Sequence, residues 1–145
     1  MITPEDAYHH AIVHGFTEEL QSICCVSPGY AVLFARDVQD ADILYCQKAA
    51  CKSSWSAFTF AESVRGADIE HCQSFAIQDP LTAYYFALFV KGANIKKCQY
   101  AACKDPQGAY WFAQYIENAN TEYCKQHMGE YLESYLRANM NSMLK

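Results

Sequence analysis

The sequence predicts an all-α fold of about five short helix-turn-helix repeats in tandem, followed by one C-terminal capping helix. The first observation is a fixed interval of 26 residues between equivalent positions. The second is that the apolar residues within each interval have helical spacing. The third is that capping residues recur at the ends of these segments. The 26-residue ladders are Cys46, Cys72, Cys98 and Cys124; Ala31, Ala57, Ala83 and Ala109; and Phe34, Phe60, Phe86 and Phe112.

The repeat that begins at Pro80 shows how each unit divides into two helices. Asp79 and Pro80 are suited to the N-cap and the first turn. Apolar residues then follow at offsets 0, 3, 4 and 7, which predicts one buried helix face. Gly92 is placed to end this helix in a left-handed conformation, and Asn94 to cap the next. The expected core of the unit is Ala83, Phe86, Ala87, Val90, Ile95, Cys98 and Ala102.

We interpret residues 1–145 as a single α-helical repeat domain. Residues 3–27 form a degenerate N-terminal cap unit, because Leu20 stands where later units have cysteine. The full repeats are 28–53, 54–79, 80–105 and 106–128. Residues 129–145 predict a helix whose apolar stripe either covers the last repeat or mediates a homodimer. That stripe comprises Met128, Leu132, Tyr135, Leu136, Asn139 and Met143.

Composition and charge restrict the function. The chain is 52% hydrophobic and 19% charged, and no segment reaches the roughly 18 consecutive apolar residues of a membrane span. The N-terminus MITPEDAYHH has no secretory signal pattern, so we expect a cytoplasmic protein. The net charge is −5, with ten acids and four bases (−6) in residues 1–72, and six acids and seven bases (+1) in residues 73–145. This balance opposes a broad phosphate-binding surface.

The eight cysteines are expected to be buried, reduced and free of disulfides. Equivalent cysteines in stacked helices lie about 8–10 Å apart, whereas a disulfide needs Cα atoms within about 7 Å. Within a unit, Cys46 and Cys51 are about 140° apart around a helix, so they do not chelate together. His10 and His14 have a metal-ligand spacing, but nothing in the sequence completes the site. We therefore expect no metal, no cofactor and no catalytic residue.

Tandem pairs of short helices resemble the α-solenoids, including the HEAT, TPR and Sel1-like classes. The pattern is also similar to alanine-, cysteine- and aromatic-rich short repeats of bacterial and phage proteins. The unit is shorter than the usual range of about 34–47 residues, and the TPR tryptophan-leucine-glycine pattern is absent. The resemblance implies a right- or left-handed solenoid that binds macromolecules and is not an enzyme. Size and composition are similar to those of phage antagonists of bacterial defence systems, such as anti-CRISPR proteins, which implies an inhibitor or an adaptor.

Two positions on the first helix of each unit depart from the repeat. Leu33 and Asp37 become Thr59 and Ser63, and large aromatic residues occupy both positions in the next two units. Variable positions on a constant scaffold are free of packing duty, and exposed aromatic patches mark interfaces. We predict a protein-binding surface there, while the alternative is that the rings fill a groove or lie under the C-terminal helix. The predicted residues are Tyr84, Tyr85, Phe89, Tyr110, Trp111 and Tyr115.

Two charged clusters give further hypotheses. Asp37, Asp40, Glu62 and Glu70 lie in the acidic half with Asp42 and Asp68. They are either caps and solvated helix faces or a surface that competes for the nucleic-acid groove of a basic partner.

The alternative function is a HEAT-like nucleic-acid-binding solenoid. It would use Lys91, Lys96, Lys97 and Lys104 together with nearby tyrosines.

Overall fold

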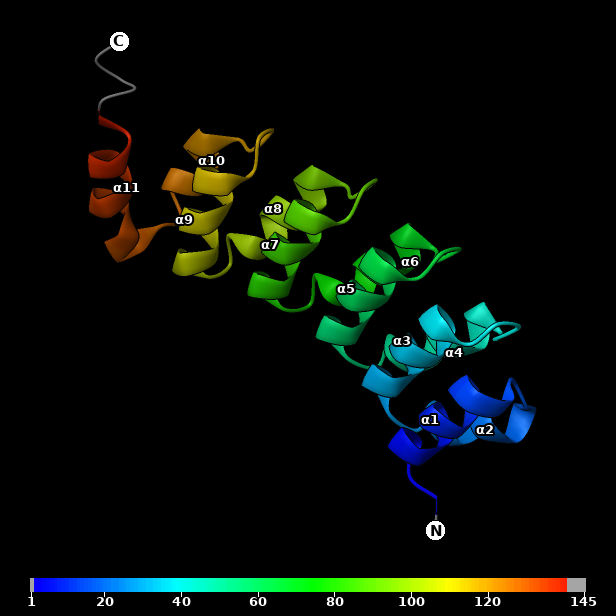
Figure 1. The fold of residues 1–145 in the computed structure, drawn as a ribbon. Helices are drawn as coiled ribbons and strands as arrows, with labels where there is room; N and C mark the ends of the chain where they lie inside the picture. The colour runs from blue at the N-terminus through cyan, green and yellow to red at the C-terminus, as the bar shows by residue number, and fades with distance from the viewer. Residues whose placement is uncertain (1, 141–145) are drawn as a thin grey trace. The chain divides into compact units, whose positions relative to one another are not determined.

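The computed structural model describes residues 2–140, and every regular element within that range is a helix (Figure 1). The predicted all-α fold with repeated helix pairs is therefore confirmed. The described chain divides into two compact units, residues 2–76 and residues 77–140. None of the helices in these residues is both long enough and apolar enough to cross a membrane.

The first unit consists of three helix pairs. They are α1 (Pro4–His14) with α2 (Glu18–Cys24), α3 (Pro28–Asp37) with α4 (Ile43–Ala50), and α5 (Ser54–Ser63) with α6 (Ile69–Ala76). The two helices of each pair pack together, and α3 also packs against α1 and α5.

The second unit consists of two helix pairs and a C-terminal segment. The pairs are α7 (Pro80–Phe89) with α8 (Ile95–Ala102), and α9 (Pro106–Tyr115) with α10 (Thr121–Lys125). A 3-10 turn, η1 (Gly129–Tyr131), then leads into α11 (Leu132–Ala138). Helix α9 packs against α7 and α8 on one side and against η1 and α11 on the other.

The predicted caps form where the sequence placed them. Asp79 accepts a hydrogen bond from the Thr82 backbone N–H at 2.9 Å, and Asn94 accepts one from the Lys97 N–H at 3.1 Å. Asp42 and Asp68 cap α4 and α6 in the same way. Each cap satisfies a donor that the helix itself leaves without a partner, which is worth about 1 kcal/mol.

Gly92 lies in the left-handed region, as predicted, with φ of 91°. It does not cap α7 directly, because that helix already ends at Phe89 and the Val90 N–H bonds to the Phe86 carbonyl. Gly92 instead turns the loop towards α8. Gly66 serves the equivalent loop with φ of 89°, and Asp40 takes this position with φ of 70°. Asp40 is the one non-glycine residue with positive φ in the described part of the chain.

The core repeats with the sequence. The four ladder phenylalanines and the four ladder cysteines are all 0% exposed. Ala35 and Ala61 are buried, but the equivalent Ala87 and Ala113 are only half-buried. Ile95 is also half-buried, whereas the other residues of the core predicted for its unit, apart from Ala87, are buried. The predicted core is therefore confirmed, except that Ala87, Ile95 and Ala113 of the second unit are only half-buried.

A buried glutamine joins successive helix pairs, and the sequence reading did not identify it. The side-chain oxygen of Gln47 accepts a hydrogen bond from the Asp68 backbone N–H at 2.8 Å. Gln21 bonds the Asp42 N–H in the same way, and Gln99 bonds the Asn120 N–H at 2.6 Å. These N–H groups precede the second helix of the next pair and have no helical partner. A glutamine side chain is long enough to reach them across the packed helices.

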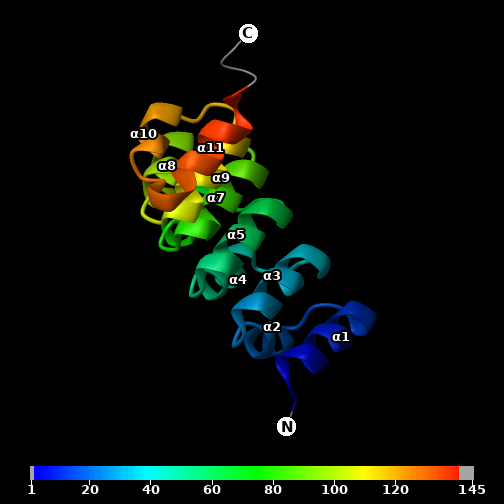
Figure 2. The same ribbon diagram turned by 90° about the vertical axis from the view of Figure 1, so that its left-hand side faces the viewer.

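The C-terminal helix covers α9 with part of its apolar stripe. Tyr135 is 7% exposed and Met128 is 0% exposed, whereas Leu136 and Met140 are 39% and 53% exposed. The Asn139 side-chain amide donates to the Gln114 side-chain oxygen at 2.9 Å. Figures 1 and 2 both show α11 beside α9. The predicted helix over 129–145 thus begins as a 3-10 turn, and Met143 lies outside the described residues.

Replacing Gln47 by methionine tests the glutamine bridge. Methionine keeps much of the side-chain volume but leaves the part-buried Asp68 N–H without its acceptor. We expect the free energy of unfolding in urea to fall by about 1–3 kcal/mol.

Lys125 is the matched control, because it occupies the equivalent position in the last pair and forms an ion pair with Glu122 instead. Lys125→Met should change stability little. Equal effects of the two substitutions would contradict a bridging role for the glutamine.

Candidate functional site

Helices α7 and α9 present neighbouring surfaces without a single charged side chain. Their sequences are PLTAYYFALF and PQGAYWFAQY. Leu88, Phe89 and Tyr115 are 38%, 57% and 60% exposed, and two further rings are half-buried beside them. The equivalent helix α3 instead carries Arg36 and Asp37. We call this surface the aromatic face; it consists of Tyr85, Leu88, Phe89, Trp111 and Tyr115.

The rings of the aromatic face touch one another across the two helices. Tyr85 and Phe89 stand one turn apart on α7 with centroids 6.2 Å apart and planes within 8°. Tyr85 also meets Trp111 of α9 edge-on at 6.4 Å. Contacts of this type are worth about 0.5–1.5 kcal/mol beyond the apolar area that they bury. The surface is therefore held in shape by its own side chains.

Of the six predicted aromatic residues, Tyr84 lies beneath this surface, and Tyr110 is half-buried against the C-terminal segment. Tyr84 is 5% exposed, its ring is 5.5 Å from Trp111, and burial raises the pKa of its hydroxyl. Tyr110 packs under the C-terminal segment, 5.9 Å from Tyr131 and 6.3 Å from Tyr135. The alternative of covered rings thus holds for Tyr84 and in part for Tyr110, while protein binding by the other rings stays a prediction. Tyr84 and Tyr110 support the surface, whereas Tyr85, Phe89, Trp111 and Tyr115 contribute to it.

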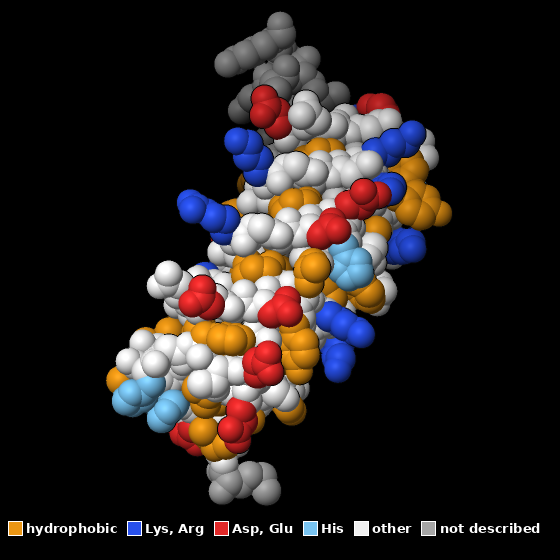
Figure 3. Space-filling view, turned by 90° about the vertical axis from the view of Figure 1, so that its right-hand side faces the viewer, with side chains coloured by type: hydrophobic (Ala, Val, Ile, Leu, Met, Phe, Trp, Pro, Cys, Tyr) orange, Lys and Arg blue, Asp and Glu red, His pale blue; other side chains and the backbone are white. Residues whose placement is uncertain are grey.

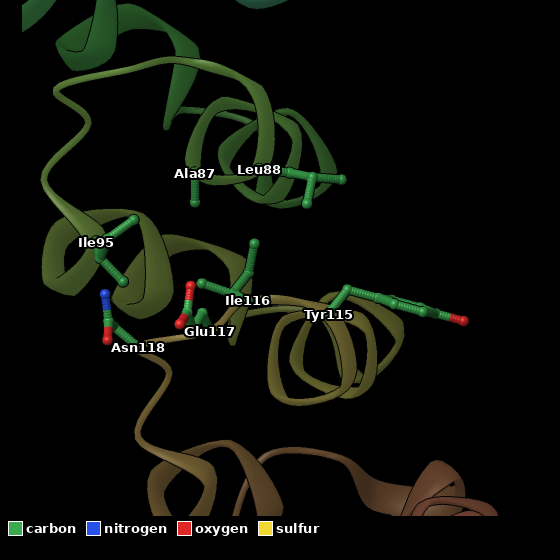
Figure 4. Close-up of a pocket in the computed structure, with 7 residues that line it drawn as sticks. All are labelled: Ala87, Leu88, Ile95, Tyr115, Ile116, Glu117 and Asn118. Carbon is green, nitrogen blue, oxygen red and sulfur yellow. The ribbon is translucent and has the colours of Figure 1, made fainter.

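A shallow pocket of about 290 Å³ adjoins the aromatic face (Figure 4). Ala87 and Ile116 point towards each other across it, Glu117 lies beside Ile116, and Tyr115 is directed away at its outer edge. Ala87 leaves space here because its side chain is small. The volume is at the lower end of the range of about 300–1,000 Å³ for ligand pockets. The lining residues are Ala87, Leu88, Ile95, Tyr115, Ile116, Glu117 and Asn118.

Asp37 of the predicted acidic surface is already engaged by its neighbours. Both of its oxygens accept hydrogen bonds from Arg36 at 2.7 Å, and one also accepts from the Tyr8 hydroxyl at 2.5 Å. The Arg36 guanidinium, with help from Tyr8, lowers the pKa of the Asp37 carboxyl. This charge is therefore largely balanced within the first unit.

The other predicted acidic residues lie singly at the surface. Asp40 occupies the left-handed loop position, and Glu62 and Glu70 are exposed on α5 and α6. Figure 3 shows a face on which acidic side chains are scattered among hydrophobic and uncharged ones. Asp42 and Asp68 are helix caps, which supports the interpretation of this cluster as caps and solvated faces.

A second exposed aromatic group lies on α8 and α10. Tyr100 is 63% exposed and stacks on Tyr123, with centroids 6.5 Å apart. The Lys104 ammonium lies 5.4 Å above the Tyr100 ring, an arrangement that attracts a cation to the ring face. Lys96 and Lys97 are exposed on α8 and form no ion pair within the described residues. We call Lys96, Lys97, Tyr100, Lys104 and Tyr123 the tyrosine-lysine group.

Cysteines of successive helix pairs touch, which the sequence reading missed. The sulfur atoms of Cys25 and Cys46 are 3.7 Å apart, and those of Cys103 and Cys124 are 3.6 Å apart. Cys51 and Cys72 have the same spacing, and hydrogen bonding with Cys72 lowers the pKa of the Cys51 thiol. The cysteines that touch do not hold equivalent positions in the repeat. Each contact joins the residue that follows the second helix of one pair to a residue in the middle of the second helix of the next pair. The recurring 21-residue spacing of these cysteines was the signal that could have identified them.

The predicted histidine pair remains incomplete. The rings of His10 and His14 are 4.4 Å apart on α1. Across residues 2–140, no group of three or more histidine, cysteine or acidic side chains is arranged to hold a metal ion.

Known proteins do not identify this site. No family model matches the chain, and no match is found among curated proteins or solved structures.

Substitution of Tyr135 by alanine tests how the site is closed at its C-terminal end. Loss of its edge-on contact with Tyr110 should release α11 and uncover Tyr110, so backbone amides of residues 129–138 should exchange faster with solvent. Hydrogen exchange resolved by mass spectrometry measures this change. Leu136→Ala is the control, because Leu136 is 39% exposed and should leave the exchange rates nearly unchanged. Faster exchange throughout the second unit would contradict a local covering role.

Proposed function

We propose that the protein is a non-catalytic binding module whose aromatic face on α7 and α9 holds a partner protein. The single observation that carries the proposal is this uncharged, ring-rich surface on two adjacent helices. A partner would cover Leu88, Phe89 and Tyr115, which otherwise expose apolar surface to water. Trp and Tyr anchors of this kind dominate the binding energy of protein interfaces.

The pocket beside the aromatic face supports a protein partner over a small cofactor. Its volume of about 290 Å³ suits one large side chain of a partner, and its lining is mixed, with aliphatic side chains beside polar ones. Glu117 is its one ionisable lining residue. A partner segment with an apolar anchor next to a basic residue would satisfy both features.

The helix-pair repeat supports the same conclusion in a general way. Stacked helix pairs form α-solenoids that keep one core and vary one surface, and such surfaces bind macromolecules. We infer that this chain uses that arrangement as an adaptor or as an inhibitor of a larger complex. The two roles would use the same residues, and the partner's activity in the presence of the chain distinguishes them.

A second candidate function, binding of single-stranded nucleic acid, is favoured by one observation. The tyrosine-lysine group combines an exposed ring with ammonium groups, and single-stranded nucleic acids bind to surfaces that pair stacking with positive charge. The net charge of −5 opposes this function for the chain as a whole. Self-association through α11 would use a different surface, the exposed Leu136 and Met140.

The double substitution Phe89→Ser and Tyr115→Ser tests the protein-binding proposal. Both side chains are more than half exposed, so the fold should persist. The loss of two interface anchors is expected to weaken binding of the captured partner at least about 30-fold. The measurement is affinity capture from the host, followed by titration of the purified partner.

Tyr100→Ser provides the control, since it removes a ring of similar exposure from α8 rather than from the aromatic face. Undiminished partner binding by the double variant would exclude the proposed surface. Capture of a small metabolite alone would exclude a protein-binding function.

The nucleic-acid candidate predicts a salt-sensitive complex. At low ionic strength, a single-stranded oligothymidylate should bind, and its affinity should fall steeply as salt is raised. Tyr100→Ala should weaken this complex about 5-fold or more by removing the stacking ring, whereas Phe89→Ala should not. A mobility-shift titration measures both effects. Absence of a shifted complex at low salt would eliminate this candidate.

A further inference from the structure

Three pairs of buried thiols join successive helix pairs in this protein. We propose that Cys25 with Cys46, Cys51 with Cys72, and Cys103 with Cys124 are oxidation sites at which a hydroperoxide forms disulfides between neighbouring repeats. The inference is independent of the partner-binding proposal, because none of these cysteines belongs to the aromatic face.

The first argument is distance. In two of the pairs the sulfur atoms are 3.7 and 3.6 Å apart, close to van der Waals contact. A disulfide bond is about 2.05 Å long, so each pair has to close by about 1.6 Å. Rotation of the two side chains would have to supply this movement.

The second argument is a consistent difference in access within each pair. Cys25, Cys51 and Cys103 directly follow the ends of α2, α4 and α8 and are 8%, 5% and 4% exposed. Their partners Cys46, Cys72 and Cys124 lie within helices and are 0% exposed. The first cysteine of each pair is therefore the one that a small oxidant would reach first.

In the two pairs of the first unit, hydrogen bonding between the thiols also favours reaction of the more exposed cysteine before its partner. The hydrogen bond shared with Cys46 lowers the pKa of the Cys25 thiol, against the opposing effect of burial. The bond shared with Cys72 does the same for the pKa of Cys51. Thiolates are the reactive form towards peroxides, so in these two pairs the more exposed cysteine is also the more reactive one. In the third pair the shared hydrogen bond acts in the opposite direction, because it raises the pKa of Cys103 and lowers that of Cys124.

The chemistry balances with hydrogen peroxide as the oxidant. The exposed thiolate attacks one peroxide oxygen, the O–O bond breaks, and the departing hydroxide takes up a proton to leave as water. The partner sulfur then attacks the sulfur of the resulting sulfenic acid and forms the S–S bond. The S–O bond breaks, and the departing hydroxyl takes up the partner thiol's proton to leave as a second water. Two thiols and one peroxide thus become one disulfide and two waters.

The remaining two cysteines provide internal comparisons. Cys24 hydrogen-bonds the Pro4 carbonyl, and burial raises the pKa of its thiol to about 11. Cys98 lies 21 residues after Ile77, where the other repeats have cysteine, and burial raises the pKa of its thiol to about 12. We expect both thiols to stay reduced when the three pairs react.

Each bond would fasten one second helix to the next. Cys25–Cys46 would join α2 to α4, Cys51–Cys72 would join α4 to α6, and Cys103–Cys124 would join α8 to α10. A disulfide restricts the unfolded chain, so the oxidised protein should be more resistant to unfolding. Oxidation would thereby stiffen the scaffold that carries the variable surface.

Peroxide treatment of the folded, full-length protein tests the proposal. Free thiols counted in denaturant should fall from eight to two, because each of three pairs loses two. The intact mass should fall by about 2 Da for each disulfide, and peptide mapping should find the three proposed cross-links. Dithiothreitol should restore all eight thiols, and Tm should be higher for the oxidised protein than for the reduced one.

Two variants make the test specific. Cys51→Ser should retain the cross-links of the other two pairs, and a mixed pattern of new partners would overturn the proposal. Ile77→Cys should add a fourth cross-link, to Cys98, without altering the three. Eight unreacted thiols, sulfinic acids without cross-links, a Cys24–Cys25 bond as the main product, or an unchanged or lower Tm after oxidation would each overturn the inference.

Discussion

The structure depends on the inability of one short helix pair to bury its own apolar face. Helix α7 has ten residues and α8 has eight, and Phe86 and Cys98 between them reach 0% exposure. Short helices gain little stability from their own hydrogen bonds, so most of their stability has to come from packing against the next pair. Each unit is therefore an array in which every pair completes the core of its neighbour. The ladders of identical residues follow directly from this requirement.

Hydrogen bonds between neighbouring helix pairs make their stacking specific. A glutamine side chain leaves its own helix pair and accepts the N–H that opens the second helix of the next, at 2.6–2.8 Å. A buried N–H without an acceptor is costly, so a pair shifted by one turn would lose this bond. Apolar contacts alone tolerate such shifts more readily. The last helix pair has no further pair to join. Lys125 occupies the glutamine position in that pair and forms an ion pair with Glu122 instead.

Because the core is fixed by the repeat, variation is confined to the outer positions of the first helices. Charge at those positions, as at Arg36 and Asp37, gives a self-contained ion pair in one unit of the chain. Rings at the same positions on α7 and α9 give a surface that is ordered by its own contacts yet still open to a partner. The same repeated geometry also brings pairs of thiols together. The proposed binding surface and the proposed sulfur chemistry thus use different parts of one scaffold.

The sequence by itself determined the helices, their caps and their core, because these depend on spacing along the chain and on local hydrogen bonds. Asp79, Asn94 and Phe86 could be assigned in this way. The tertiary structure decided which aromatic rings are exposed: Tyr84 is buried and Tyr110 half-buried, while Phe89 and Tyr115 are exposed. It also decided that Cys25 meets Cys46, since contact between repeats depends on the offset of stacked helices. A one-dimensional period marks equivalent positions, but only packing shows which non-equivalent positions touch.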